Sequence, residues 1–143
     1  MIRKIDERIS VAPQIAPEDL PAIAAAGFTT IVNNRPDGEE PGQPDGAAIA
    51  RAAAEAGLGY VAIPVTHAGF SSPQVEAMAA ALVGAQGPVL AYCRSGTRSC
   101  NLWALASARL GEAGPEVLTA KAAAAGYDLT GIRPLLDALS ART

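Results

Sequence analysis

The sequence predicts an α/β fold with a mainly parallel central sheet flanked by helices. Short β-branched or apolar runs alternate along the chain with longer, alanine-rich stretches in which apolar residues recur at helical spacing. Strands that are each followed by a helix form parallel sheets with helices on both faces. Half of the 143 residues are apolar, which is enough for a core, and no linker composition interrupts them. We therefore expect one domain over residues 1–143.

Four segments have the character of strands. The first alternates apolar and polar side chains until Pro13 limits it, whereas the other three are buried-type runs. The second strand is followed by an acidic stretch, 33–44, rich in Asn, Pro and Gly, and a loop of that length commonly carries function. The expected strands are residues 5–12, 28–32, 60–65 and 89–92.

Helix boundaries are indicated by capping residues and by glycines. Gly27 and Gly57 are placed to end helices, while Asp45 and Ser72 are placed as N-caps. The expected helices are residues 17–26, 47–56, 73–83, 98–110, 116–125 and 132–139.

Composition excludes several classes of partner. The net charge of −3 and the scattered Lys and Arg residues give no basic surface for nucleic acid. Residues 1–6 lack the apolar core of a signal peptide, and no apolar run is long enough for a membrane span, so we expect a cytoplasmic protein without a membrane partner. The two cysteines are expected to be thiols. No metal-ligand spacing is present, and no cofactor is expected.

The segment after strand 89–92 carries the chemistry. It runs from Cys93 to Arg98 and leads directly into a helix, so backbone N–H groups, the helix dipole and the Arg98 guanidinium all favour an anion there. Such surroundings lower a cysteine pKa from about 8.5 to roughly 3.5–7.5, so Cys93 is predicted to be a thiolate nucleophile. The residues expected to bind the substrate here are Arg94, Ser95, Gly96, Thr97 and Ser99.

Three further strings, together with the cysteine loop, carry a resemblance to a known family. They are Asn-Asn-Arg-Pro-Asp-Gly-Glu at 33–39, Pro-Val-Thr-His at 64–67 and Asn-Leu-Trp-Ala-Leu at 101–105. Over about residues 1–110 the chain is similar to a bacterial family described as phosphatase-like proteins and as sulfur transferases, found alone or fused to beta-lactamase-like hydrolase domains. The resemblance implies the fold of dual-specificity (tyrosine) phosphatases with a rhodanese-like active-site loop.

Loop length favours sulfur transfer among the activities that the resemblance implies. Tyrosine phosphatases place five residues between cysteine and arginine, whereas four separate Cys93 from Arg98, and Tyr92 stands where phosphatases commonly have His. We therefore expect a rhodanese-like sulfurtransferase that moves sulfane sulfur through a Cys93 persulfide to an acceptor thiol. Its substrate would be a small sulfur-containing anion or a persulfide, and a persulfide dioxygenase or another sulfur-metabolism protein is a candidate partner.

Two alternatives remain open. The first is a cysteine-dependent phosphatase that acts on a phosphate ester through a Cys93 phosphocysteine, with His67 or Asp37 as the general acid, since His67 aligns with the acid position of phosphatases. The second is a noncatalytic anion-binding module that uses the same loop.

Residues outside the cysteine loop are expected to support it. Asn34, Arg35 and Asp37 follow the second strand and are expected to bind the substrate or brace the site, although Arg35 could equally pair with Asp37 or Glu39. Glu39 and Glu40 belong to the same acidic loop, and we expect them to be solvated, with contact to the substrate as the alternative. Cys100 is expected to be a small buried helix residue, with a resolving thiol for oxidised Cys93 as the alternative.

Overall fold

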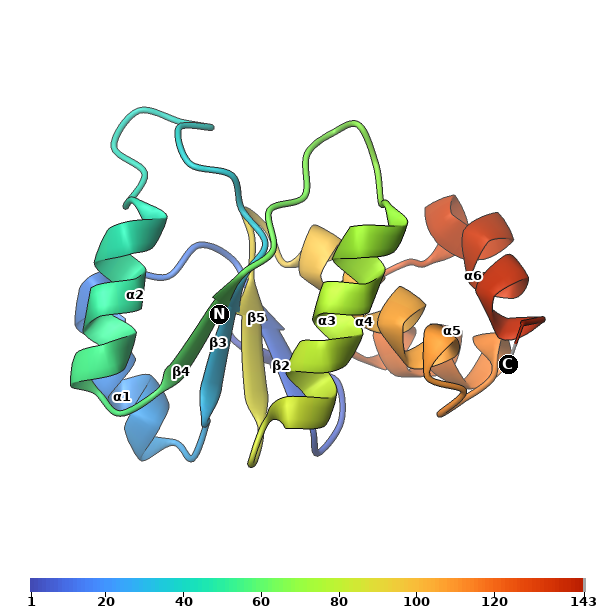
Figure 1. Cartoon of the computed structure of the whole chain (residues 1–143), viewed down its shortest axis with the longest axis horizontal. Coiled ribbons are helices and arrows are strands. Elements are labelled where there is room, and N and C mark those ends of the chain that lie inside the picture. The colour runs from blue at the N-terminus through green and yellow to red at the C-terminus, as the bar shows by residue number, and fades with distance from the viewer. Residues whose placement is uncertain (143) are drawn as a thin grey trace.

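A five-stranded sheet lies between layers of helices in the computed structural model, which describes residues 1–142 (Figure 1). The strand order is β1-β2-β5-β3-β4, in which β1 is antiparallel to β2 and every other neighbouring pair is parallel. The mainly parallel sheet expected from the sequence is confirmed. The strands are β1 (Arg3–Lys4), β2 (Ile9–Ala12), β3 (Thr30–Asn33), β4 (Gly59–Ala62) and β5 (Val89–Tyr92).

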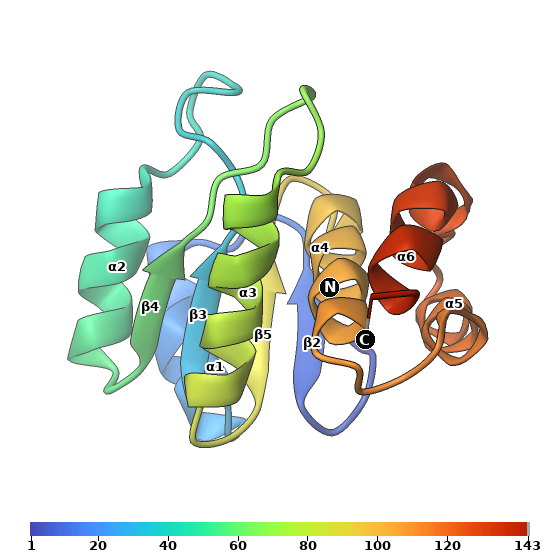
Figure 2. The same ribbon diagram turned by 45° about the vertical axis from the view of Figure 1, so that its right-hand side comes forward.

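Helices cover both faces of the sheet. On one face α1 and α2 pack against it, and on the other α3 and α4 do, with α5 and α6 stacked on the far side of α4 (Figure 2). Within residues 1–142, no helix combines the length and the apolar character that a membrane crossing requires. The helices are α1 (Leu20–Ala25), α2 (Gly46–Glu55), α3 (Ser72–Gly84), α4 (Thr97–Arg109), α5 (Pro115–Ala124) and α6 (Arg133–Ser140), with 3₁₀ turns at Pro17–Asp19 and Thr130–Ile132.

The central strand β5 separates two hydrophobic clusters. Its alternate side chains point to opposite faces, so Leu90 and Tyr92 pack with α1 and α2, while Val89 and Ala91 pack with α3 and α4. All four side chains are almost completely buried. The chain that leaves β5 therefore starts from the best-fixed position in the sheet.

The first predicted strand, 5–12, is wrong in its first half. Residues 6–8 form a bend in which the Asp6 carboxylate accepts hydrogen bonds from the backbone N–H groups of Arg8 (2.9 Å) and Ile9 (3.2 Å). An Asp that satisfies backbone donors two and three residues on favours a turn over a strand. The chain reverses there, and β1 adds to the sheet as an antiparallel edge.

The predicted strand 60–65 is shorter than expected: β4 ends at Ala62 and is not buried, whereas Ile63 and Val65 beyond it are. Because β4 is the last strand in the sheet, its side chains are exposed or half-buried along its length. The predicted helix ends agree better with the structure than the predicted strand ends do. Gly27 and Gly57 end helices with φ of +103° and +80°, as expected. The N-cap of α3 is Ser71, one residue before the expected Ser72.

The carboxyl ends of β2, β3, β4 and β5 lie at one edge of the sheet. The loops that follow β3 and β4 extend from this edge side by side, and the turn after β5 lies beneath them (Figures 1 and 2). Loops at this edge of an open parallel sheet border the usual ligand crevice. This edge holds Cys93.

Candidate functional site

Cys93 directly follows β5 and has no exposed surface. Its backbone N–H donates to the carbonyl of Ala12 at 3.3 Å, so the residue is fixed to the end of β2. The backbone N–H of Gly96 donates to Cys93 Sγ at 3.1 Å. The sulfur therefore lies inside the turn that leads to α4, where an N–H donor and the positive end of a 13-residue helix both stabilise negative charge.

Gly96 makes this turn possible. It is the N-cap of α4 with φ of +92°, a left-handed conformation that side chains with a Cβ rarely adopt. A Cβ at this position would also lie 2.3 Å from the hydroxyl oxygen of Tyr127. Both the backbone angle and the neighbouring ring therefore require glycine here.

Arg98 lies in the first turn of α4 and is held by the loop after β3. Its Nη1 and Nη2 atoms donate to the two carboxylate oxygens of Glu39 at 2.7 and 2.8 Å, and Nη1 also donates to the carbonyl of Val65 at 2.7 Å. The pKa of Arg98 is raised, chiefly by Glu39 and also by a hydrogen bond and charge interaction with Cys93. The guanidinium thus links the acidic loop to the sulfur.

Glu39 is shared by two arginines. Besides Arg98, it accepts a 2.8 Å hydrogen bond from Nε of Arg35, whose side chain is 3% exposed. These interactions, with Arg98 the strongest, lower the pKa of Glu39 from 4.5 to about 2 although partial burial opposes the shift. Glu39 is therefore ionised at neutral pH and cannot donate a proton. The expectation that this residue is simply solvated was wrong.

Arg35 and Arg94 complete a cluster of charges around the turn. Arg35 also donates to Glu40 at 2.7 Å and to the side-chain oxygen of Gln14 at 3.1 Å. Arg94 is exposed and pairs with Glu40 at 3.0 Å. Three guanidinium groups, those of Arg35, Arg94 and Arg98, against the carboxylates of Glu39 and Glu40 leave one net positive charge.

Asn34 connects three elements and is completely buried. Its backbone N–H donates to the carbonyl of Tyr92 at 2.8 Å, and its side chain donates to the carbonyl of Ile63 at 2.9 Å. Its Oδ1 atom accepts from the hydroxyl of Ser99 at 2.8 Å. Asn34 therefore fixes the start of α4 relative to β5 and to the segment after β4.

The remaining predicted residues lie around the mouth of the turn or away from it. Ser95 and Thr97 are exposed, and their hydroxyls are 3.1 Å apart. His67 is exposed on the loop after β4. The Asp37 carboxylate accepts the backbone N–H of Gly46 at 2.8 Å, so it caps α2. Among residues 1–142, no group of three His, Cys, Asp or Glu side chains is arranged to hold a metal ion.

Sequence reasoning missed two contributors to this site, Gln14 and Tyr127, and did not predict that Glu39 pairs with Arg98. The hydroxyl of Tyr127 donates to the carbonyl of Ser95 at 3.2 Å, although the two residues are 32 positions apart. For Glu39, an available signal was the proximity that parallel topology imposes on the loop after β3 and the turn after β5. For Tyr127 the sequence holds no comparable signal, because it follows a helix outside the sheet.

Cys100 is a buried residue of α4, as expected. Burial, and to a smaller extent the charge of Cys93, raise the pKa of Cys100 to about 12. It is therefore a protonated thiol at neutral pH, which distinguishes its environment from that of Cys93, where a backbone N–H is directed at the sulfur.

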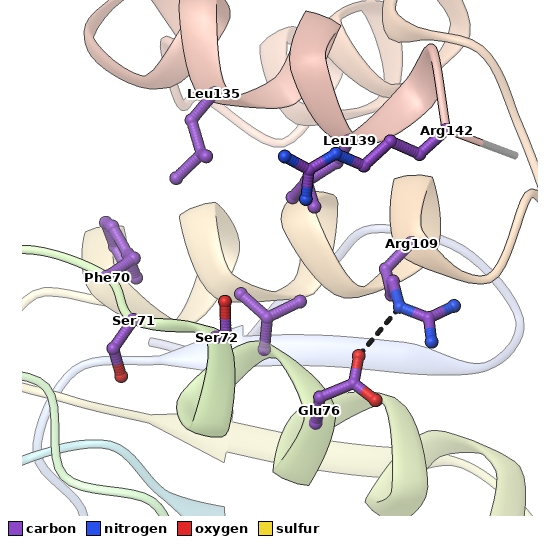
Figure 3. A pocket seen from close by; sticks show the side chains of 9 residues that line it. Phe70, Ser71, Ser72, Glu76, Arg109, Leu135, Leu139 and Arg142 are labelled. Atoms are coloured by element: carbon purple, nitrogen blue, oxygen red, sulfur yellow. Dashed lines mark ion pairs between the residues drawn. The ribbon is translucent and has the colours of Figure 1, made fainter.

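A hollow lies elsewhere, between α3, α4 and α6. It has a volume of about 410 Å³, and Phe70, Leu135 and Leu139 contribute apolar walls, while Arg109 pairs with Glu76 at its side (Figure 3). None of the residues around Cys93 lines it. The Cys93 turn is therefore separate from this hollow.

Comparison with known proteins identifies the family. A family model described as the phosphatase-like domain of beta-lactamase hydrolase-like proteins matches residues 1–110. The chain belongs to this family. It is 36% identical over 138 residues to a beta-lactamase hydrolase-like protein of Agrobacterium fabrum, a match that covers 96% of the chain and 32% of the relative. The chain spans about a third of the length of the curated relatives it matches.

Solved structures agree with this family. The crystal structure of a candidate phosphatase from Neisseria meningitidis is 39% identical, has a TM-score of 0.82 and covers 96% of this chain and 97% of its own. PTPMT1 is 11% identical with a TM-score of 0.76, over 99% and 98% of the two chains, a likeness of fold alone. The expected family and dual-specificity phosphatase-like fold are confirmed. These likenesses fit the phosphatase alternative better than the sulfurtransferase that we expected first.

Replacement of Gly96 should damage the turn. In Gly96→Ala the left-handed φ and the contact with Tyr127 displace the N–H that faces Cys93, so alkylation of Cys93 by iodoacetamide should slow at least several-fold. Gly57→Ala is the control, because it has φ of +80° but open space around it. Both variants should lose about 1–3 kcal/mol of stability, and only Gly96→Ala should alter alkylation. Equal alkylation rates would show that the turn tolerates a Cβ.

Removal of the Glu39 charge should give a pH-dependent loss of stability. Because the folded-state pKa of about 2 lies below 4.5, the stabilisation is complete above pH 4.5 and disappears as the pH falls toward 2. In urea unfolding, Glu39→Gln should therefore be less stable than the unmodified chain by about 3 kcal/mol at pH 7, with a smaller gap at pH 3. Glu7→Gln, at a 91% exposed side chain, is the control. A gap independent of pH would contradict the assigned cause.

Proposed function

We propose that the chain is a cysteine-dependent enzyme that hydrolyses phosphate monoesters through a Cys93 phosphocysteine. The observation that carries the proposal is the 3.1 Å hydrogen bond from the Gly96 N–H to Cys93 Sγ at the start of the helix that carries Arg98, within a fold shared with phosphatases. A thiolate in this position has an electrophile-binding cradle directly in front of it. The family membership supports the same reading.

The reaction proceeds in two displacements. Cys93 Sγ attacks phosphorus, the S–P bond forms, and the P–O bond to the leaving group breaks with its electron pair on that oxygen. Water then attacks the phosphocysteine, the S–P bond breaks, and inorganic phosphate and the Cys93 thiolate are released. The Arg98 guanidinium and the backbone N–H groups at the start of α4 stabilise the charge on the non-bridging oxygens.

Protonation of the leaving oxygen limits the substrates. Glu39 is ionised and Asp37 caps α2, so neither is a free carboxylic acid above Cys93. His67, on the exposed loop after β4, is the general acid of the proposal. Aryl phosphates, whose leaving groups need little protonation, are accordingly the favoured substrate class.

Sulfur transfer is the second candidate, and the short loop favours it. Only four residues separate Cys93 from Arg98. A loop of this length crowds a phosphoryl group but still accommodates one additional sulfur atom. In that reaction the thiolate attacks the outer sulfur of thiosulfate, the S–S bond breaks, and sulfite leaves with the electron pair. An acceptor thiolate then removes the sulfur from the Cys93 persulfide, and a persulfide-consuming enzyme would be the partner. This step requires no acid.

Intact mass after brief exposure to substrate discriminates the candidates. With an aryl phosphate the proposal predicts a gain of one phosphoryl group on Cys93 in rapidly acid-quenched samples, accompanied by release of the phenol. With thiosulfate or glutathione persulfide, a gain of one sulfur atom would establish the second candidate. Cys93→Ser must abolish either adduct, and Cys100→Ser must retain it. A gain of sulfur without a gain of a phosphoryl group would overturn the phosphatase proposal. If neither adduct forms, both reactions are excluded and anion binding is the remaining function.

His67→Gln tests the acid. We expect kcat to fall by roughly 10²-fold on alkyl phosphates and to change little on aryl phosphates with acidic phenols. A plot of rate against leaving-group basicity should become steeper in the variant. A uniform fall for all substrates would contradict a role for His67 in proton donation.

A further inference from the structure

Tyr127 brings a part of the chain outside the matched family region into the Cys93 turn. The match ends at residue 110, and Tyr127 follows α5. Its hydroxyl donates to the carbonyl oxygen of Ser95 at 3.2 Å, and its ring lies against Gly96. No role for this residue follows from the two displacements described above.

The hydrogen bond from Tyr127 falls on a particular peptide unit. The carbonyl of Ser95 and the N–H of Gly96 are the two polar groups of one peptide plane, and this N–H donates to Cys93 Sγ at 3.1 Å. In a trans peptide the two groups point in opposite directions. A donor fixed on the carbonyl side therefore determines where the N–H points on the other side.

Tyr127 is itself held in place. Its backbone N–H donates to the carbonyl of Ala122 at 2.8 Å, which fixes it to the end of α5. The guanidinium of Arg3 lies 5.9 Å from the ring centre and donates to the carbonyl of Ala125 at 3.1 Å. Burial raises the pKa of the Tyr127 hydroxyl, so the group stays protonated and remains a donor. The donor thus has a fixed position and a constant protonation state.

We propose that Tyr127 is a positioning residue that orients the 95–96 peptide so that the Gly96 N–H remains directed at the Cys93 sulfur. The proposal rests on the role of Cys93 as the nucleophile, whichever anion it attacks. The chain Tyr127 O–H, Ser95 carbonyl, Gly96 N–H and Cys93 sulfur is a series of coupled hydrogen bonds, and each polarises the next. Loss of the hydroxyl removes the contact on the carbonyl side of this peptide, so the N–H is held less firmly and the thiolate loses part of its stabilisation.

Tyr127→Phe removes the hydroxyl and keeps the ring. In the full chain we expect alkylation of Cys93 by iodoacetamide at pH 7 to slow roughly fivefold, the size of one net hydrogen bond. The amide proton of Gly96 should shift in the NMR spectrum at the same time. Thr119→Val is the matched control, because it removes a hydroxyl bonded to the carbonyl of Pro115 within α5 and should change neither quantity.

A second variant separates orientation from packing. Tyr127→Leu removes both hydroxyl and ring; if the hydroxyl is what matters, its alkylation rate should fall about as far as that of Tyr127→Phe. Unchanged alkylation and an unchanged Gly96 amide signal in Tyr127→Phe would overturn the proposal, as would an effect confined to Tyr127→Leu. Alkylation of Cys93 does not require turnover. If no Cys93 adduct forms with substrate, the proposed function is contradicted, but the alkylation experiment still tests this inference.

Discussion

The ion pair between Arg98 and Glu39 is the contact on which the site depends. It joins the first turn of α4 to the loop after β3, across 59 positions of sequence, and it is extended by Arg35, whose guanidinium is nearly inaccessible to water. A buried guanidinium without a carboxylate partner would be strongly destabilising. The loop therefore has a defined position although its composition is that of a flexible connection.

The two proposed chemistries differ in small features of the site. A thiolate at the end of β5 with an arginine in the following helix serves any reaction that begins with attack on an anion. The identity of the reaction then depends on the size of the turn and on a proton source above it. The turn is short, and the carboxylate that pairs with Arg98, that of Glu39, is ionised at neutral pH. Family membership thus indicates a phosphatase-like fold, whereas these local features bear on which reaction Cys93 would carry out.

Local sequence patterns predicted the features that depend on neighbouring residues. Strand β5, the helices and the glycines at their ends follow from spacing and backbone preference, and Cys93, Gly96 and Arg98 lie on one short turn. The bend that interrupts residues 5–12 depends on hydrogen bonds to the Asp6 side chain. The exposure of β4 depends on its place at the edge of the sheet. Glu39 and Tyr127 required tertiary proximity. Their contacts join residues that are far apart in the sequence, so no periodic pattern predicts them.

The charge cluster around Cys93 has a consequence for how substrates arrive. Three guanidinium groups face two carboxylates, and the thiolate of the proposed function makes the cluster electrically neutral. A neutral cluster projects little field beyond a Debye length of about 8 Å. Anions are therefore not steered from a distance, and the rate of encounter should respond weakly to ionic strength. Recognition begins only on contact, when the approaching group meets the N–H donors of the turn.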